Sequence, residues 1–435
     1  MNLGDGIPAA LVELGPQILG SISMVERCPT SRDRILVLTP RFPYPPLGGD
    51  RLRIYQICRQ LSTRFDLSLL SMCESDEEMD APIPNDGVFA RVERVFHGKW
   101  GRVVGSLRAI PSRTPIQVGY YRNPDFEKRL RHMASEHDCL LAHLIRTAPY
   151  IAPFHLPKVL EMTDAISMSY LRTARHSRSI SAALHFLEGR RLVNFEREMA
   201  LKCDLNVLVS EVDREFLFPS GEARNVLVCS NGVDAGALPF QFAPDGKTII
   251  FIGKNSTRPN MDAILFFQEE VFPLVRARLP EARFKVIGQI ETEFRRKLEA
   301  RGVIVTGTVP SVADAAAGAS VGVCPLRIGA GIQNKILEYM AFGVPTVTSP
   351  VGLEGLAAVS GVHLMTADHP SEWADRIVEL LVDRSISAPM AFAARRFVEE
   401  HHSWSAHIAS LADSIHGLIR SSGTGSFRGA ANIIQ

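Results

Sequence analysis

The stretch that decides the fold runs Val321-Gly-Val-Cys-Pro-Leu-Arg-Ile-Gly-Ala-Gly331 and continues Ile-Gln-Asn-Lys-Ile-Leu-Glu-Tyr-Met-Ala-Phe-Gly-Val-Pro345. Its first four residues form a short apolar run, which is typical of a buried parallel strand. A glycine loop follows, and an amphipathic helix is predicted over 332–342. Gly343 ends that helix and Pro345 precedes the next strand. Strand, loop and helix in this order predict one unit of a doubly wound α/β sheet.

The same stretch carries side chains suited to a nucleotide. Backbone N–H groups and the helix dipole favour a phosphate at such a loop. Lys335 and Glu338 are three residues apart and share a helix face. A carboxylate in this place can accept hydrogen bonds from ribose hydroxyls. We therefore predict a binding site that includes Arg327, Gly329, Gly331 and Glu338; the alternative is that Lys335 and Glu338 are only a surface pair.

Further short apolar runs alternate with helical patterns along the whole chain. In the first half the runs are Ile35–Leu38, Leu67–Ser71, Val92–Phe96, Cys139–Leu144, Val159–Met162, Leu205–Val209 and Val226–Cys229. In the second half they are Thr248–Ile252, Phe284–Ile287, Val303–Val305, Thr346–Thr348 and His363–Met365. Helices are predicted over Arg51–Ser62, Asp262–Arg278 and Glu372–Leu381. Each half has enough strands for one Rossmann-like parallel sheet, so we predict two.

Chain length supports two domains. The chain has 435 residues. A single hydrophobic core stops growing at ~250–300 residues, so a longer chain normally forms more than one domain. Gly, Pro and Asp cluster between Gly236 and Asp245, just before a strand, and mark the boundary. We predict domains at 34–240 and 246–390, with helices over 391–420 that cross back to the first domain. Residues 1–33 are predicted to be a poorly ordered or docked extension, and 421–435 a flexible tail.

Composition excludes several classes of protein. Apolar residues make up 46% and charged residues 22%, which excludes a disordered or fibrous chain. The net charge of +1 gives no drive toward nucleic acid. Seven cysteines without a C-x-x-C pair indicate reduced thiols in a cytoplasmic protein rather than disulfides or zinc. No run reaches the ~18–20 apolar residues of a membrane span, and the N-terminus lacks the basic leader of a signal peptide.

Two more loops follow predicted strands. The first, Thr39-Pro-Arg-Phe-Pro-Tyr-Pro-Pro-Leu-Gly-Gly-Asp50, places Gly48 and Gly49 where backbone can approach a ligand at a helix start; the alternative is a plain turn. The second brings Gly253, Lys254 and Arg258 to the end of a strand, where two cations can clamp a diphosphate; the alternative is a solvated loop. Because ligands of open α/β sheets bind beyond the carboxyl ends of the strands, we expect the site in a cleft between the domains.

Together these stretches resemble the family 4 retaining glycosyltransferases, which have the GT-B fold of two facing Rossmann-like domains. The resemblance covers roughly Arg34 to Leu418. Within the family, the chain resembles more narrowly the exopolysaccharide-associated bacterial sugar transferases. The matching motifs are the glycine loop Pro46–Gly49, Asn231-Gly-Val-Asp234, Gly253-Lys254 with Arg258, and Glu338-Tyr-Met-Ala-Phe-Gly-Val-Pro345. The narrower likeness comes from Thr163-Asp-Ala-Ile-Ser-Met-Ser-Tyr170 and Arg258-Pro-Asn-Met-Asp262.

The resemblance implies a function. A sugar would pass from a nucleotide-diphosphate donor, most commonly a UDP-sugar, to a saccharide or lipid-linked saccharide, with retention of configuration and without a metal or other cofactor. In the family, the cations that stabilise the leaving diphosphate are the central catalytic parts. Lys254, Lys335 and Asp164 are then the catalytic candidates, with Gly253, Arg258, Arg327, Gly329, Gly331 and Glu338 on the donor. The first domain would hold the acceptor near Gly48, Gly49, His143 and Arg146.

One departure from the family leaves two alternatives open. The family motif has a first glutamate that touches the transferred sugar, and it would fall at Ala330. A non-catalytic partner of the same fold is therefore an alternative, as is a nucleotide-sugar 2-epimerase. Asp164 has its own alternative as a helix N-cap, and His143 and Arg146 as structural residues. Lys335 and Glu338 are expected outside the apolar core.

A basic segment at 91–131 has two interpretations. It includes Arg94, Lys99, Arg102, Arg108, Arg113 and Arg122 around Trp100, Tyr120 and Tyr121. It is either a solvated face or a surface that contacts anionic lipid headgroups. The second interpretation gives a cytoplasmic protein that is peripheral to the inner face of a membrane.

Overall fold

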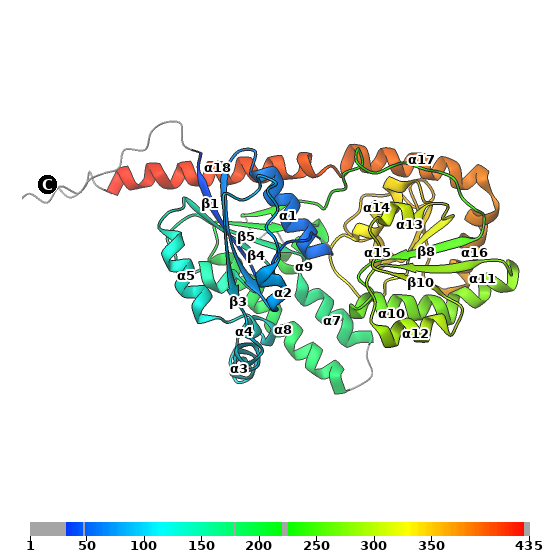
Figure 1. Cartoon of the computed structure of the whole chain (residues 1–435), viewed down its shortest axis with the longest axis horizontal. Coiled ribbons are helices and arrows are strands. Elements are labelled where there is room, and N and C mark those ends of the chain that lie inside the picture. Colours follow the sequence, from blue (N-terminus) through cyan, green and yellow to red (C-terminus); the bar gives the residue numbers. More distant parts are fainter. Residues whose placement is uncertain (1–31, 47, 177–179, 220–224, 430–435) are drawn as a thin grey trace, which may run out of the picture. The chain divides into compact units, whose positions relative to one another are not determined.

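Two parallel β-sheets with helices on both faces make up the protein, as the predicted α/β class requires (Figure 1). The computed structural model describes residues 32–46, 48–176, 180–219 and 225–429. The predicted extension up to residue 31 and the chain end at 430–435 lie outside the described residues. The described parts match thirteen predicted strands, seven in the first sheet and six in the second.

The first sheet has the order β3-β2-β1-β4-β5-β6-β7. Its strands are β1 (Arg34–Thr39), β2 (Asp66–Cys73), β3 (Arg91–Phe96), β4 (Cys139–His143), β5 (Lys158–Thr163), β6 (Leu205–Leu208) and β7 (Val226–Val228). Its helices are α1 (Gly49–Leu61), α2 (Asp76–Asp80), α3 (Lys99–Ala109), α4 (Ile116–Tyr120), α5 (Pro124–Ala134), α6 (Ala148–Ile151), α7 (Ile166–His176), α8 (Ile180–Leu201) and α9 (Glu211–Leu217).

The second sheet repeats this topology, with the order β10-β9-β8-β11-β12-β13. Its strands are β8 (Thr248–Ile252), β9 (Arg283–Ile287), β10 (Ile304–Gly307), β11 (Val321–Cys324), β12 (Thr346–Thr348) and β13 (Met365–Thr366). The helices after β8 are α10 (Arg258–Phe266), the π-helix η2 (Phe267–Val271), α11 (Phe272–Arg278), α12 (Thr292–Glu299), α13 (Val312–Ala316), α14 (Asn334–Phe342), α15 (Pro350–Leu353), α16 (Pro370–Val382), α17 (Arg384–His401) and α18 (Trp404–Gly429).

Both sheets reverse their strand order beside the first strand of each half. The reversal lies between β1 and β4 in the first sheet and between β8 and β11 in the second. Ligands of open α/β folds bind at such a switch point, beyond the carboxyl ends of the two strands. The central strands are apolar on both faces because helices cover each side; in β1, every residue after Arg34 is buried.

Helix α18 belongs to the core of the first sheet although it follows the second in sequence. Trp404, Ile408 and Leu411 are buried in one apolar cluster with Ile35 and Val37 of β1. Helix α17 instead packs its Phe397 and Val398 into the core of the second sheet. The chain therefore crosses back at the end of α17. Helix α18 continues to Gly429, past Ser421, where the flexible tail is predicted to begin.

A tyrosine fills the space between β8 and β11. Tyr339 on α14 is fully buried, and its hydroxyl accepts the N–H of Ile252 at 2.9 Å. The same hydroxyl lies 3.2 Å from the carbonyl oxygen of Val323. A Cβ atom on Gly322 would lie 2.6 Å from the tyrosine ring, so the strand needs glycine there. The phenol thus joins the two strands of the second switch point.

The predicted helix over Asp262–Arg278 has a different internal structure. Helix α10 starts earlier, at Arg258, and the π-helical turn η2 separates it from α11. The buried rings of Phe267 and Phe272 both face Phe284 of β9, with centroids at 4.6 and 5.8 Å. A π-helical turn shifts the register of the following side chains, a change that hydrophobic spacing alone does not predict.

Candidate functional site

Lys335 is a buried cation at the second switch point. Its Nζ donates to Oδ1 of Asn260 at 2.7 Å, and it lies 4.3 Å from the ring centroid of Phe251. Only 7% of the residue is exposed, which corrects the expectation that it lies outside the apolar core. Burial lowers the pKa of its ammonium group, although Glu338 opposes that shift. A neutral amide thus holds Lys335, so its charge is free to pair with an anion.

Asn260 joins the loop after β8 to helix α14. Its Nδ2 donates to the carbonyl oxygen of Lys254 at 3.0 Å, while its Oδ1 accepts from Lys335. A Cβ atom on Gly253 would lie 2.8 Å from that Nδ2, so glycine leaves the room the amide needs. The structure therefore brings together Gly253, Lys254 and Lys335, which the sequence placed on separate motifs.

The other two predicted donor cations differ in their surroundings. Lys254 and Arg258 are exposed, and Nη1 of Arg258 lies 3.2 Å from Nε2 of His185 on α8. Arg327 is instead held by a two-point ion pair with Asp262, at 3.0 and 2.7 Å, and lies 4.8 Å from the Phe266 ring. Arg327 therefore contacts the middle and the end of α10, and its role in donor binding stays a prediction.

Glu338 is a carboxyl group that titrates near neutrality. Burial raises its pKa to about 7, against the opposite effect of Lys335 one turn earlier. A half-buried carboxylate is stabilised by hydrogen-bond donors. Ribose hydroxyls are donors of that kind, so the arrangement fits the predicted contact to a nucleoside.

A buried polar chain crosses the first switch point, and the sequence reasoning did not find it. Arg53 on α1 and Glu161 on β5 are fully buried, with Nε 2.8 Å from Oε1. The other oxygen of Glu161 lies 2.5 Å from Nδ1 of His143. Nη1 of Arg53 donates to Asn231 at 2.8 Å, and the amide of Asn231 donates to Oδ1 of Asn334 at 2.8 Å. The chain therefore ends at the first residue of α14.

Charge pairing determines the ionisation of Glu161. Burial alone would raise the pKa of this carboxyl, but Arg53 and His143 outweigh it and lower the pKa to about 2. Glu161 also accepts the N–H of Thr163 at 3.0 Å. Its negative charge is thus paired with buried groups of the protein itself.

Two strained residues end the neighbouring strands β4 and β5. Leu144 and Thr163 have φ values of 65° and 69°, a left-handed conformation that non-glycine residues rarely adopt. Strain of this kind costs about 1–3 kcal/mol per residue and occurs most often at functional sites. The bond from Thr163 to Glu161 helps to hold it, and the strained turn sets the direction of the next residue, Asp164.

Asp164 lies against the glycine loop that follows β11. A Cβ atom on Gly331 would lie 3.1 Å from Cβ of Asp164 and 3.4 Å from its Oδ2. Burial raises the pKa of Asp164 to about 7, Asp213 adds to the shift, and Arg146 opposes it. The structure thus brings together Asp164 and Gly331, two predicted site residues from different sheets. At neutral pH this carboxyl group can accept or release a proton.

Of the remaining first-domain candidates, one lines a cavity of about 400 Å³. We call it the tyrosine cavity, after the rings of Tyr120, Tyr121 and Tyr170 in its wall. Arg146 also lines it, with Nε 3.1 Å from Gln117 Oε1 and the guanidinium 5.2 Å from the Tyr121 ring. Arg41, the second cation in the wall, bonds the Tyr121 hydroxyl at 3.2 Å.

The predicted glycine pair adjoins these residues. Gly48 has φ +93° and precedes α1, and a Cβ atom on Gly49 would meet nothing within 4 Å. Asp50, the next residue, pairs with Arg41 at 3.3 Å. Burial would raise the pKa of Asp50, but Arg41 and His143 outweigh it and hold the pKa below its usual range. His143 and Arg146 thus both act electrostatically on Asp50, the residue that follows the glycine pair.

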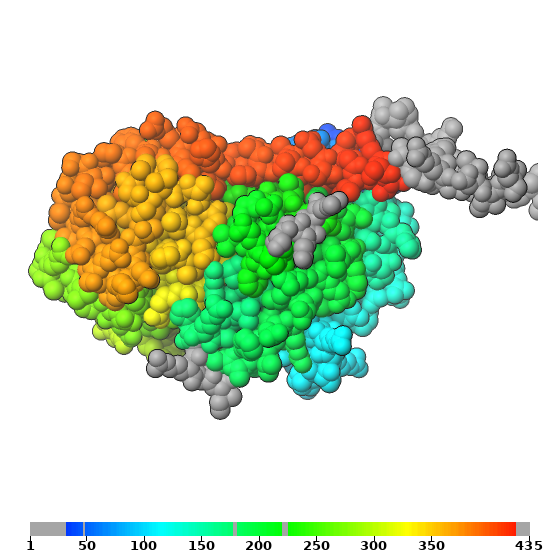
Figure 2. Space-filling view, turned by 180° about the vertical axis from the view of Figure 1, so that it is seen from behind, coloured from blue at the N-terminus to red at the C-terminus, as the bar shows by residue number. Residues whose placement is uncertain are grey.

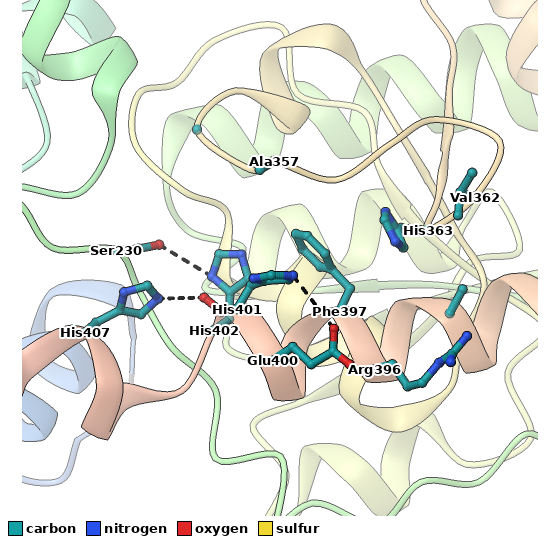
Figure 3. Close-up of a pocket in the computed structure, with 12 residues that line it drawn as sticks. Ser230, Ala357, Val362, His363, Arg396, Phe397, Glu400, His401, His402 and His407 are labelled. Atoms are coloured by element: carbon teal, nitrogen blue, oxygen red, sulfur yellow. Dashed lines mark hydrogen bonds and ion pairs between the residues drawn. The ribbon is translucent and has the colours of Figure 1, made fainter.

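A larger cavity, of about 620 Å³, lies at the junction of α17 and α18 (Figure 3). Its wall includes His363, His402 and His407 but none of the predicted site residues. His402 is 3.0 Å from the carbonyl oxygen of Asn231, and burial lowers its pKa to about 4. His402 is therefore neutral at physiological pH, which fits a structural role at this junction.

Within residues 32–46, 48–176, 180–219 and 225–429, no three His, Cys, Asp or Glu side chains are grouped to hold a metal ion. In the same ranges, no helix has the length and apolar character to cross a membrane. The six cysteines among them are buried and free; Cys28 lies outside.

Comparison with known proteins shows what the second domain resembles. A family model described as "Glycosyl transferases group 1" matches residues 246–383. The second domain is similar to group 1 glycosyl transferases. A curated Klebsiella pneumoniae relative, the "Uncharacterized 44.6 kDa protein in cps region", is 23% identical over 163 residues. That match covers 35% of this chain and 42% of the relative, so it spans less than half the length of either.

Solved structures extend the likeness to the whole fold. Anabaena HepE in complex with UDP and glucose is similar with a TM-score of 0.63 and 14% identity, over 89% of this chain and all of that one. Sucrose-phosphate synthase from Thermosynechococcus elongatus is similar with a TM-score of 0.70 and 14% identity, over 90% of this chain and all of that one. The predicted GT-B fold is thereby confirmed.

Sequence signals for the missed residues existed in part. Asn231 and Asn260 lie in two of the motifs that carry the family resemblance. Glu161 is a charged residue within an apolar strand, and such a residue needs a buried partner. Nothing local marks Arg53 as that partner, because 108 residues separate the two.

Proposed function

We propose that the protein is a retaining glycosyltransferase that moves a sugar from a nucleotide-diphosphate donor to a saccharide or lipid-linked saccharide. The observation that carries the proposal is the position of Lys335. It is a buried cation at the second switch point, held by Asn260 rather than by a carboxylate, with Glu338 one turn along the same helix. A diphosphate of opposite charge would complete this arrangement, and Glu338 would hold the ribose.

The catalytic scheme needs no protein nucleophile. Lys335, Lys254 and Arg258 stabilise the charge that grows on the leaving diphosphate. The acceptor hydroxyl attacks from the same face of the sugar as the leaving group departs, which retains the configuration. Its proton passes to the diphosphate, and Asp164, whose side chain lies beside Gly331 of the glycine loop, can assist. UDP is the proposed nucleotide, because HepE binds UDP and glucose.

The biological setting we propose is cytoplasmic synthesis of a bacterial polysaccharide. It is supported by the Klebsiella relative, whose name places it in a cps region. The first domain, 34–240, would hold the acceptor and the second, 246–390, the donor.

A non-catalytic partner is the second candidate, and Ala330 is the observation that favours it. This residue packs against the apolar cluster of the first sheet, where the family motif has a carboxylate on the sugar. Transfer would then depend on Arg327 and Lys335, or be lost.

One experiment separates the two candidates. Mass spectrometry of nucleotides retained by the purified protein identifies the donor, and titration calorimetry with UDP measures binding. Release of UDP from that donor in the presence of acceptor-containing lysate shows turnover. Binding with turnover supports the enzyme, and binding without turnover under all acceptor conditions supports the partner. The absence of both binding and turnover would contradict the proposal.

A further inference from the structure

The apolar face of helix α3 points outward, into solvent. Trp100, Val103, Val104 and Leu107 are 83%, 49%, 39% and 59% exposed. Their spacing of three, four and seven residues is that of one helix face. In a surface helix this stripe normally faces the core. Here the only buried residue of α3 is Ala109.

The packing of α3 explains why its stripe is free. A Cβ atom on Gly105 would lie 2.1 Å from the carbonyl oxygen of Gly119, so the two helices α3 and α4 meet through their glycines. Arg102 faces the same way and donates to Glu74 and to the Tyr120 hydroxyl, at 3.1 and 3.0 Å. The protein thus holds α3 by its glycine and polar side and leaves the apolar side uncovered.

Helix α8 extends the exposed apolar surface. Leu184, Phe186 and Leu187 are 56%, 48% and 60% exposed. Nη2 of Arg191 on α8 donates to the carbonyl oxygen of Ile110, directly after α3, at 2.8 Å. Figure 2 shows the cyan lobe that contains α3 beside the green surface of the first domain. We call the exposed apolar residues of α3 and α8 the outer patch.

The charged residues of the segment that contains α3 have one sign. The sequence from Arg94 to Arg122 has six basic residues and no acidic one. Lys99, Arg108, Arg113 and Arg190 are exposed. The one carboxylate on this part of α8, Glu188, is buried and accepts the N–H of Gln117 at 3.4 Å. Apolar residues with a tryptophan, bordered by cations, have the chemistry of a surface that inserts at a lipid interface.

The outer patch is continuous with the tyrosine cavity. Leu184 belongs to the patch and lines the cavity, and Ser106 of α3 lines it too. We propose that the outer patch docks on a bilayer rich in anionic lipids and brings a lipid-linked acceptor to the tyrosine cavity. The inference rests on the proposed function, because it names how the acceptor reaches its site. Arg41 and Arg146 in the cavity wall suit an anionic linkage between the lipid and its sugar.

Sedimentation with vesicles tests the docking without any nucleotide. The full chain is mixed with vesicles of phosphatidylcholine, with or without 30 mol% (about one third) phosphatidylglycerol. Each basic residue near an anionic surface strengthens binding about fivefold. We expect at least tenfold stronger binding to the anionic vesicles, with a loss in high salt.

Paired variants assign the binding to the outer patch. Trp100→Ser with Leu107→Ser should weaken binding at least tenfold (roughly 1.4 kcal/mol), as should Arg108→Glu with Arg113→Glu. The control is Val359→Ser with Val382→Ser, at residues of the second domain that are 53% and 60% exposed. It should keep binding within twofold, and all three variants should keep the melting temperature of the parent.

Three outcomes would overturn the proposal. They are no binding to anionic vesicles, equal binding by the Trp100 and Leu107 variant, or a parent dimer in light scattering that this variant dissociates. The last would make the patch an interface between two copies of the chain. Because no nucleotide is present, these failures are distinct from a failure to bind UDP.

Discussion

The two switch points share one topology but treat charge in opposite ways. At the first, Arg53 and Glu161 are fully buried and neutralise each other. At the second, Lys254 and Arg258 are exposed and Lys335 bonds only a neutral amide. An internal ion pair makes a rigid frame but leaves no charge for a ligand, whereas cations without a carboxylate partner remain available to an anion. We therefore expect the first site to position neighbouring residues and the second to bind an anion.

Breaking the ion pair of the first site should have the largest effect. Arg53→Met leaves Glu161 buried with only His143 beside it, and removal of one partner of a buried pair costs about 3–5 kcal/mol. We expect a loss of that size in the free energy of unfolding, measured by urea denaturation at pH 7. The control is Arg278→Met, whose partner Asp375 is 67% exposed and whose loss should cost under about 1 kcal/mol. Equal, small losses would contradict the comparison.

The same pair predicts a direction with pH. The pKa of Glu161 is lowered from 4.5 to about 2 in the folded state, so its stabilisation is complete above pH 4.5 and is lost as the pH falls toward 2. Glu161→Gln should therefore destabilise the protein at pH 7 but leave much less difference from the parent near pH 2.

Removing the charge of Lys335 should have the next largest effect, on turnover. Lys335→Met keeps an apolar side chain of similar length beside Phe251, so we expect folding to be preserved while the proposed contact to phosphate is lost. A charge-assisted contact is worth about 1.5–3 kcal/mol, roughly ten- to a hundredfold in kcat. Glu338→Gln should mainly raise the donor KM, because the ribose is bound equally before and during the reaction. Steady-state kinetics that show equal, small effects of both changes on kcat would reject the assignment.

A smaller effect is expected in the pH profile. Burial raises the pKa of Asp164 to about 7, so a role as proton acceptor predicts a kcat that rises with pH through that value. Saturating donor removes the contribution of Glu338 to binding. Asp164→Asn should abolish the inflection, and a profile of unchanged shape would leave Asp164 as a structural residue.

The smallest expected effect is that of a chelator. If cations of the second site alone stabilise the leaving diphosphate, EDTA should leave turnover within twofold of its value without chelator. Activity that disappears with EDTA and returns with Mn²⁺ would show that a metal ion, and not the protein cations alone, stabilises the leaving diphosphate.

The sequence predicts the scaffold better than the contacts made by its polar residues. The ranges Thr248–Ile252 and Val321–Cys324 match β8 and β11 because a continuous apolar run determines a parallel strand. The loop residues Gly253 and Lys254 follow from the position of that strand. In contrast, nothing along the chain predicts the ion pair of Arg327 with Asp262, 65 residues away. Pairings across such distances depend on packing, and no spacing along the chain records them.

The buried phenol of Tyr339 has a consequence for variation in this protein. Its ring occupies the volume that a side chain at position 322 would need, so neither residue can be exchanged alone without a clash or a void. We expect that Tyr339→Ala lowers stability and that Gly322→Ala in the same chain restores part of it, whereas Gly322→Ala alone is poorly tolerated. Positions 322 and 339 should therefore covary, so that a relative with a different residue at one of them also differs at the other.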